Sequence, residues 1–466
     1  MSHRATRTVG AMLLALMGVL VVGARTSEVA ASSLGTIYVA NDGATPSITE
    51  YSVGASGNAT PSATISGSLT GLTVPVGVAV DSSGTLYVAN STVGTITEYS
   101  AGANGNIAPI RTITGLDVPY ALAFDESGDL YVANQGTGSS DAGSVAEYAP
   151  GAHGAATPTA TIAGGSTGID RPVGLAFDGT GTLYVNNYGS NVTEYTSGVS
   201  GAPVRTITST DLDGGTFLMA VDAAGTSYIA NPGGPPANSI IEFPYLASGS
   251  VTPVVLGSGG ATDLDFPRAV GLDASGNLYA TNTSSDEITE YAPGANGLAA
   301  PISTIVGGGT GLEAPFGITI DYPTTTTVTS SQNPQAVGQA VHYTATVAPT
   351  PNGGTVAFSD AGTPITGCAA VAVSGGTATC TVTYSSAATH TVTATYEGNS
   401  EFQSSVSAGL TQAVTAVPVP ESGAVGTGGR GSPLGATLAV GLTLLLAGVG
   451  LLGWERRRWS GHRHPG

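Results

Sequence analysis

Residues 75–90 read PVGVAVDSSGTLYVAN, and this stretch decides the fold. Two short apolar runs, residues 76–80 and 86–89, flank the polar residues 81–84. Apolar runs of this length are typical of strands that are covered on both faces. Asp81 followed by Gly84 favours a type I turn, in which the Asp side chain bonds to the backbone ahead of it. The stretch therefore predicts a hairpin of two buried strands.

The same unit recurs along residues 34–321. Its tyrosine has six copies spaced 44 to 53 residues apart, at Tyr38, Tyr87, Tyr131, Tyr184, Tyr228 and Tyr279. The D-x-x-G turn returns at 125–128, 178–181, 222–225 and 273–276. A Glu-aromatic pair marks a third strand in each unit, and Ile65, Ile113, Ile162, Ile207 and Ile305 mark a fourth. Four strands at this period predict the blades of a β-propeller.

The two ends of the repeat region complement each other. No central strand precedes residues 36–41, and no second strand follows residues 316–321. A propeller must join its first and last blades, because open sheet edges would otherwise remain. We therefore predict that residues 316–321 pair with residues 36–41 and close a six-bladed propeller over residues 34–322.

The unit P-x-G-x-A-x-D-x-x-G-x-L-Y-V-A-N resembles that of NHL-repeat β-propellers over about 290 residues. The chain departs from that family in two ways, because Asn stands where the family usually has Asp after L-Y-V-A, and the Arg that often begins the third strand is missing. The resemblance implies the propeller fold. It does not extend to the RNA-binding members of the family, whose basic face this chain lacks.

Residues 323–415 have a different sequence pattern from the repeat that precedes them. Residues 337–347, VGQAVHYTATV, alternate between apolar and polar, as a strand with one solvated face does. About seven short strands in this segment suggest a sandwich. The patterns VGQAVHYTATV, GTVAFSD and HTVTATYEGNSEF closely resemble bacterial Ig-like repeat domains of surface proteins. The sequence therefore predicts an Ig-like β-sandwich after the propeller, and an all-β fold for both domains.

The two cysteines, Cys368 and Cys380, lie in this second segment. An even pair in an exported protein predicts a disulfide. The alternative is a thiolate metal site completed by His342 and His390, although neither spacing matches a zinc motif.

Both ends of the chain resemble targeting signals. Residues 1–31 have a basic start, an apolar run and small residues, which predict a cleaved signal peptide; an uncleaved N-terminal anchor is the alternative. Residues 416–433 predict a flexible stalk. Residues 434–454 carry no charge and predict a transmembrane helix, which the basic tail at residues 455–466 follows.

This arrangement predicts an exported single-pass protein at the cell surface with its C-terminus in the cytoplasm, because positive charge stays on the cytoplasmic side. Between Ser32 and Pro433 there are 5 Arg against 29 acidic residues. The alternative for the tail is a bacterial sorting signal that is cut and replaced by a surface linkage.

Composition narrows the classes of function. The 12 basic residues are all Arg, the acidic residues number 31, and the net charge is −19. A protein that binds nucleic acid through phosphate contacts needs a basic face. The sequence therefore excludes nucleic acid as a partner.

Acidic residues recur in the loops that enter the central strands. They are Asp117, Asp170, Asp213, Asp265 and Glu313, with Asp211 beside the third of them. The loops that begin at Asn90, Asn134, Asn187, Asn231 and Asn282 should share this face, which predicts an Asn-studded acidic rim. Such a rim suits a weakly bound Ca²⁺, a cationic group or a sugar. The alternative is a set of solvated acids that keep an exported protein soluble, and no other cofactor is expected.

The first functional hypothesis is a non-enzymatic surface protein that displays the propeller for protein or glycan binding and adhesion. The alternative is a metal-assisted propeller hydrolase or lyase that acts outside the membrane. That chemistry needs ligands converging in the central channel, and the propeller region has one histidine, His153, in a Gly/Ala-rich loop. A third reading is a structural repeat protein of the envelope. No catalytic residue is predicted.

Overall fold

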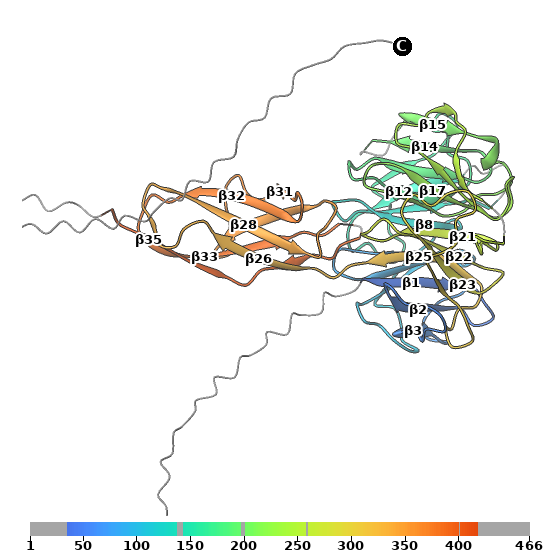
Figure 1. Ribbon diagram of the computed structural model, residues 1–466, viewed down its shortest axis with the longest axis horizontal. Helices are drawn as coiled ribbons and strands as arrows, with labels where there is room; N and C mark the ends of the chain where they lie inside the picture. Colours follow the sequence, from blue (N-terminus) through green and yellow to red (C-terminus); the bar gives the residue numbers. More distant parts are fainter. Residues whose placement is uncertain (1–34, 138–142, 197–200, 258–259, 400, 418–466) are drawn as a thin grey trace, which may run out of the picture. The chain divides into compact units, whose positions relative to one another are not determined.

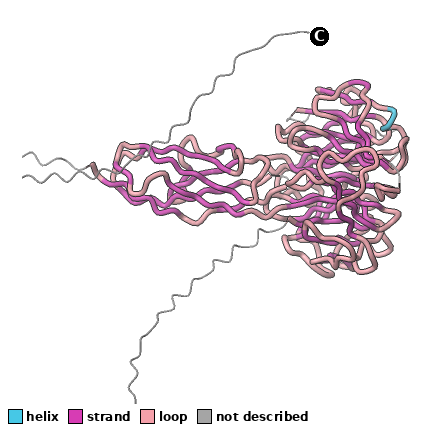
Figure 2. The backbone as a smooth tube through the Cα atoms, in the orientation of Figure 1, coloured by secondary structure: helices cyan, strands magenta, loops and turns pink. Residues whose placement is uncertain are grey.

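The structure is a computed structural model that describes residues 35–137, 143–196, 201–257, 260–399 and 401–417. Strands dominate this part of the chain (Figure 1, Figure 2), and its one helical element is the 3-10 turn η1, Thr210–Leu212. None of its helical segments has the length and apolar character that a membrane crossing requires. The predicted signal peptide (1–31), transmembrane helix (434–454) and tail (455–466), and the stalk from residue 418, lie outside the described residues.

Six sheets form the first region, each with the four strands that the repeat predicts, and one of them has a short fifth strand. The first four, written from the central strand outward, are β25 (Pro315–Asp321), β1 (Thr36–Asn41), β2 (Ser47–Ser52), β3 (Ala63–Ser66); β4 (Pro75–Val80), β5 (Leu86–Asn90), β6 (Thr95–Tyr99), β7 (Arg111–Thr114); β8 (Pro119–Phe124), β9 (Leu130–Asn134), β10 (Ser144–Tyr148), β11 (Ala160–Ile162); and β12 (Pro172–Phe177), β13 (Leu183–Asn187), β14 (Asn191–Tyr195), β15 (Arg205–Thr208). The last two are β16 (Met219–Val221), β17 (Ser227–Asn231), β18 (Ser239–Phe243), β20 (Val254–Leu256); and β21 (Pro267–Leu272), β22 (Leu278–Asn282), β23 (Glu287–Tyr291), β24 (Ser303–Ile305). Leu256 occupies the fourth-strand position that the sequence analysis did not locate in the fifth blade.

Strands from the two ends of the region close the ring. β1 pairs antiparallel with β25, with Thr36 opposite Asp321 and Val39 opposite Ile318. Each central strand contacts the central strand of the next blade, and β25 contacts both β4 and β21. The predicted closure is therefore confirmed.

A second set of contacts ties the blades together at the outer rim. Gly57 forms a parallel bridge with Ile305 of the last blade, and its amide donates to the Thr304 carbonyl at 2.7 Å. Equivalent bridges join Gly105 to Ile65, Gly154 to Ile113 and Gly297 to Leu256, and β19 (Gly249–Ser250) pairs with β15. Gly57 lies at φ +61, where a side chain would be strained. These latches cover the outermost strand of the preceding blade and protect its edge.

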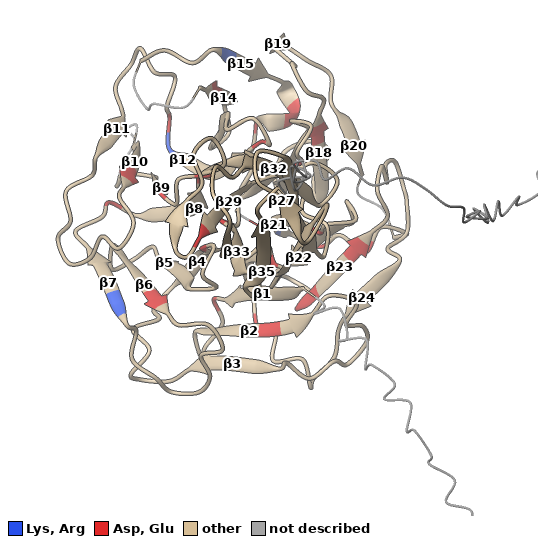
Figure 3. Ribbon diagram, turned by 90° about the vertical axis from the view of Figure 1, so that its left-hand side faces the viewer, with Lys and Arg blue, Asp and Glu red and all other residues tan. Residues whose placement is uncertain are grey.

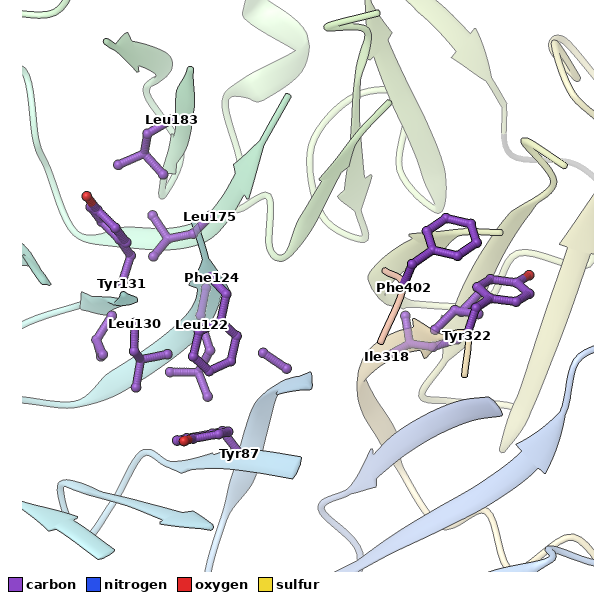
Figure 4. Packing of buried hydrophobic residues seen from close by; sticks show 14 of the residues in the cluster. Tyr87, Leu122, Phe124, Leu130, Tyr131, Leu175, Leu183, Ile318, Tyr322 and Phe402 are labelled. Carbon is purple, nitrogen blue, oxygen red and sulfur yellow. The ribbon is translucent and has the colours of Figure 1, made fainter. Parts of the chain in front are cut away.

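Aromatic side chains connect the blades in the core. The Tyr87 ring of β5 meets the Phe124 ring of β8 edge-on at 5.0 Å between centroids (Figure 4). Tyr131 meets Phe177 of β12 at the same distance. Such pairs contribute about 0.5–1.5 kcal/mol beyond the area that they bury. The repeated tyrosine therefore packs against the end of the next central strand.

The second region contains two sheets. One holds β26 (Thr325–Ser330), β28 (Ala340–Ala348) and β32 (Thr377–Thr383); the other holds β27 (Gln335–Ala336), β35 (Leu410–Thr415), β33 (Ala388–Tyr396), β29 (Thr355–Asp360), β30 (Thr363–Pro364), β31 (Val371–Ala372) and β34 (Ser405–Val406). Alternate residues of β28 are buried. Tyr343, Phe358 and Tyr396 fill the core between the sheets. Cys368 and Cys380 form a disulfide with an S–S distance of 2.01 Å.

Candidate functional site

One end of the propeller, here called the turn face, carries the D-x-x-G turns. In the copy at residues 81–84, the Asp81 Oδ1 atom accepts hydrogen bonds from the Ser83 and Thr85 amides, each at 2.9 Å. The same two bonds recur at Asp125, Asp178, Asp222 and Asp273. These carboxylates are therefore turn formers, as the repetition indicates.

The Ig-like region contacts the turn face. The Ser404 amide donates to the Ser82 carbonyl at 2.6 Å, and the Gln403 amide donates to the Tyr322 carbonyl at 2.8 Å. The Tyr322 and Phe402 rings stack at 5.1 Å between centroids (Figure 4). Gln403 Nε2 also donates to Asp321, which ends β25 at the position where the other central strands lead into a D-x-x-G turn. The described residues of both regions form one compact unit.

A channel runs between the central strands and encloses a cavity of about 130 Å³. Its walls come from all six central strands, and among the described residues that line it Glu401 of the Ig-like region is the one that carries a charge. Burial raises the pKa of Glu401 to about 7, which the hydrogen bond from Asn352 partly opposes. The Ig-like loop around Glu401 thus borders the channel on the turn face.

The opposite end, here called the loop face, is where the central strands begin. The asparagines at the ends of the second strands are buried beneath it, which corrects the predicted Asn-studded rim. Asn41, Asn90, Asn134, Asn187, Asn231 and Asn282 are at most 6% exposed.

The buried asparagines hold the loops that carry the acids. Asn90 donates to Thr97 Oγ1 at 3.2 Å, and its Oδ1 atom accepts from the Thr73 amide at 3.1 Å. The amides of Asp170, Asp265 and Glu313 donate to Asn187, Asn282 and Asn41 in the same manner. The amide side chains therefore satisfy backbone groups and position the acidic loops.

The five predicted acids, Asp117, Asp170, Asp213, Asp265 and Glu313, are all exposed at the loop face. Asp170 lies 3.9 Å from the Arg171 guanidinium, and Glu313 accepts a bond from the Ala44 amide at 3.0 Å. Across the described residues, no three His, Cys, Asp or Glu side chains come together in a way that would hold a metal ion. The structure thus spreads the acids around the face and does not gather them into a Ca²⁺ site.

The residue after four of these acids has a left-handed backbone. Val118, Arg171, Phe266 and Ala314 have φ between 50° and 57°. Each precedes the proline that begins a central strand. Non-glycine residues adopt this conformation only where the surrounding structure imposes it.

Aromatic side chains converge on the axis at this end. Tyr120, Phe217, Arg268 and Phe316 come from four different blades and occupy the same position in the repeat, the first variable residue of P-x-G-x-A-x-D. Tyr120 lies 5.6 Å from Phe316 and 6.1 Å from Phe217, between ring centroids. Tyr188 meets Phe217 at 5.7 Å. We call these residues, with Phe266, the axial cluster.

Arg268 lies among these rings. Its guanidinium carbon is 4.3 Å from the Phe217 centroid and 4.7 Å from the centroids of Phe266 and Phe316. Burial lowers the pKa of Arg268, and the nearby Tyr120, Tyr188 and Asp42 oppose that shift. Its Nε atom is buried without a hydrogen-bond partner in the described part of the chain. The repeat pattern alone does not reveal this cluster, because four of its residues occupy a position that the pattern leaves variable.

Comparisons with known proteins bear mainly on the second region. Residues 328–415 match the family model of the bacterial Ig-like domain, group 3. This segment is a bacterial Ig-like domain. No curated protein matches the chain.

Several solved structures resemble the chain. A protein of unknown function from Bacteroides caccae is 14% identical, with a TM-score of 0.45, over 62% of this chain and 99% of its own. A protein from Lactobacillus plantarum is 15% identical, with a TM-score of 0.41, over 62% and 99%. Virginiamycin B lyase from Staphylococcus aureus is 11% identical, with a TM-score of 0.36, over 56% and 81%. At these scores the likeness carries no argument about activity.

Proposed function

We propose that this chain is a non-enzymatic binding protein of the bacterial cell surface whose propeller, of the NHL-repeat type, takes a glycan at its loop face. In this proposal the signal peptide exports the chain and the C-terminal span anchors it, with the basic tail in the cytoplasm. The Ig-like domain and the stalk then hold the propeller away from the membrane.

The two ends of the propeller favour the loop face as the binding surface. The Ig-like loop that contains Gln403 and Ser404 contacts the turn face, so a ligand would have to displace it there. The loop face has the axial cluster at its centre and exposed acids around it. Binding surfaces are commonly built from loops that a rigid scaffold positions.

The observation that carries the proposal is the axial cluster. Tyr120, Tyr188 and Phe266 are only half-buried, so parts of their side chains remain accessible. Ligand sites combine aromatic surface with a few polar groups that fix orientation. A sugar ring offers an apolar C–H face to the rings and hydroxyl donors to the carboxylates of Asp117, Asp170 and Asp265, which accept when ionised. This pairing favours a glycan over a protein among the two predicted partner classes.

We do not propose the metal-assisted hydrolase or lyase, because no observation in the described residues favours it. His153, the histidine of the propeller region, is bonded to the Gly151 carbonyl in its own loop at 3.0 Å and is exposed.

A glycan array probed with the purified full chain tests the proposal. We expect binding to a limited set of glycans and a loss of about tenfold or more in affinity for Tyr188→Ala, because aromatic contacts dominate such interfaces. Tyr245→Ala is the matched control: this exposed tyrosine also lies beside an arginine, 5.7 Å from Arg205, but away from the axial cluster. An array without binding, or equal losses in both variants, would contradict the proposal.

A further inference from the structure

The arginines of the described region divide into two pairs. Arg111 of β7 contacts Glu98 at 2.6 Å, and Arg205 of β15 contacts Glu194 at 2.6 Å, so each neutralises a buried carboxylate. Both lie on the fourth strands of their blades, where Figure 3 shows the basic positions of β7 and β15 in blue. Arg268 instead belongs to the axial cluster, and Arg171 lies beside the cluster, with its guanidinium 4.8 Å from the Tyr188 centroid. An acidic chain with few cations thus places two of them at one site.

Arg268 has no carboxylate in ion-pair contact within the described residues, where the arginine ion pairs involve Arg111, Arg171 and Arg205. Three aromatic rings surround its guanidinium, and its Nε atom is buried and unpaired. A buried charge without a counter-charge is unfavourable in an apolar setting. A carboxylate fits a guanidinium, since its two oxygens accept two parallel N–H bonds.

We infer that the glycan bound at the loop face carries a carboxylate that pairs with Arg268, so that the ligand class is an acidic glycan containing a uronic acid. This inference rests on the proposed function and names the ligand of the same site. A uronic acid has three groups that the loop face can bind: an apolar ring face for the aromatic rings, a carboxylate for Arg268 and several hydroxyl donors for the exposed acids.

The surrounding acids do not prevent this pairing. Asp117, Asp170, Asp213, Asp265 and Glu313 are exposed, and salt screens charges at exposed positions more than buried ones. Asp42 is the acid whose charge acts on Arg268, and burial raises the pKa of Asp42 while Arg268 opposes that rise. Asp42 therefore competes with an incoming carboxylate, and removing its charge should tighten binding.

The test compares a galacturonic-acid trimer with its methyl ester, measured by calorimetry on the full chain. We expect the acid to bind about tenfold or more tightly than the ester, and the preference to weaken in 0.5 M NaCl. Arg268→Gln should lower the affinity for the acid by about tenfold to hundredfold and that for the ester by a clearly smaller factor. The control Glu98→Gln/Arg111→Gln removes an arginine without leaving a buried carboxylate, and should bind both as the wild type does.

Different negative results distinguish the acidic-ligand inference from the proposed glycan-binding function. Equal binding of acid and ester to the wild type overturns the acidic ligand and leaves the glycan-binding function standing. No binding of either trimer, together with an array without binding, overturns both. If Arg268→Gln does not fold, as judged by thermal melting, Asp42→Asn decides: tighter binding of the acid supports the pairing, and unchanged affinity overturns it.

Discussion

The turn face of the propeller has the same residues in most blades, whereas the centre of the loop face has different residues in different blades. At the turn face, five blades repeat the same Asp and Gly, and each Asp satisfies the backbone of its own turn. At the loop face, the first variable residue of the repeat is of four different types among the six blades: Val76, Tyr120, Val173, Phe217, Arg268 and Phe316. The positions that repeat build the scaffold, and the positions that differ form the axial cluster. In a repeat protein, the exceptions to the repeat are therefore the first residues to test for binding.

Deletion of β25, the strand that runs between the two faces, should have the largest effect on stability. β25 begins at the loop face with Pro315 and Phe316 and ends at the turn face with Asp321, and it pairs with β1 to close the ring. A chain ended at Gly311 lacks this strand, which exposes two edges, so we expect it to unfold or aggregate. A chain ended at Thr326 keeps the strand and should remain folded, with a lower melting temperature because Tyr322 loses Phe402. Circular dichroism and thermal melting measure both, and a native melt for the Gly311 chain would contradict the closure account.

The pH dependence of stability should arise at the turn face. Burial raises the pKa of Glu401 from 4.5 to about 7, so the folded chain binds more protons than the unfolded chain between these pH values. Stability conferred by the neutral form is then present at pH 4.5 and lost as the pH rises to about 7. Glu401→Gln should reduce that loss by at most about 3 kcal/mol. Denaturant titrations at pH 5 and pH 8 measure it.

Glu313→Gln is the control for this prediction, because Glu313 is an exposed acid of the loop face. It should leave the pH dependence of the wild type unchanged. A shift of the same size in both variants would remove Glu401 as the cause.

Acids of the turn face and of the loop face should differ in how much they contribute to the free energy of unfolding, and this is a smaller effect. Asp178 is 7% exposed and accepts bonds from the Thr180 and Thr182 amides, each at 2.9 Å. Asp178→Ala should therefore cost about 2 kcal/mol of unfolding free energy and leave glycan affinity unchanged. Asp265→Ala, at the exposed rim, should change stability by about 0.5 kcal/mol or less. The reverse order in urea denaturation would show that the scaffold role belongs to the loop acids.

Local patterns predicted much of this fold. The D-x-x-G turns, the buried Tyr-Val-Ala strands and the unmatched ends of the repeat were enough to predict six blades and the pairing of β25 with β1, because each depends on a short motif or on counting. The latches at Gly57 and its equivalents were missed, since they bridge neighbouring blades and nothing within one repeat reveals their partner.

The candidate site was predicted less completely. The sequence placed the five acids at one face, where the structure has them, but their neighbours Asn90, Asn187 and Asn282 proved to be buried supports. Exposure depends on how the loop folds back over the strand end, which spacing does not determine. The axial cluster joins Tyr120, Phe217, Arg268 and Phe316 across the ring, so it emerges only when the repeats are aligned and their differences compared.

Hydrogen exchange of the full chain, with and without the galacturonic-acid trimer, tests the central claim most directly. The account predicts slower exchange at the starts of the central strands, around Tyr120, Arg268 and Phe316, and unchanged exchange at the turns of residues 81–85, 125–129 and 178–182. Protection confined to the turns or to the Ig-like domain would contradict the claim that the loop face is the binding surface.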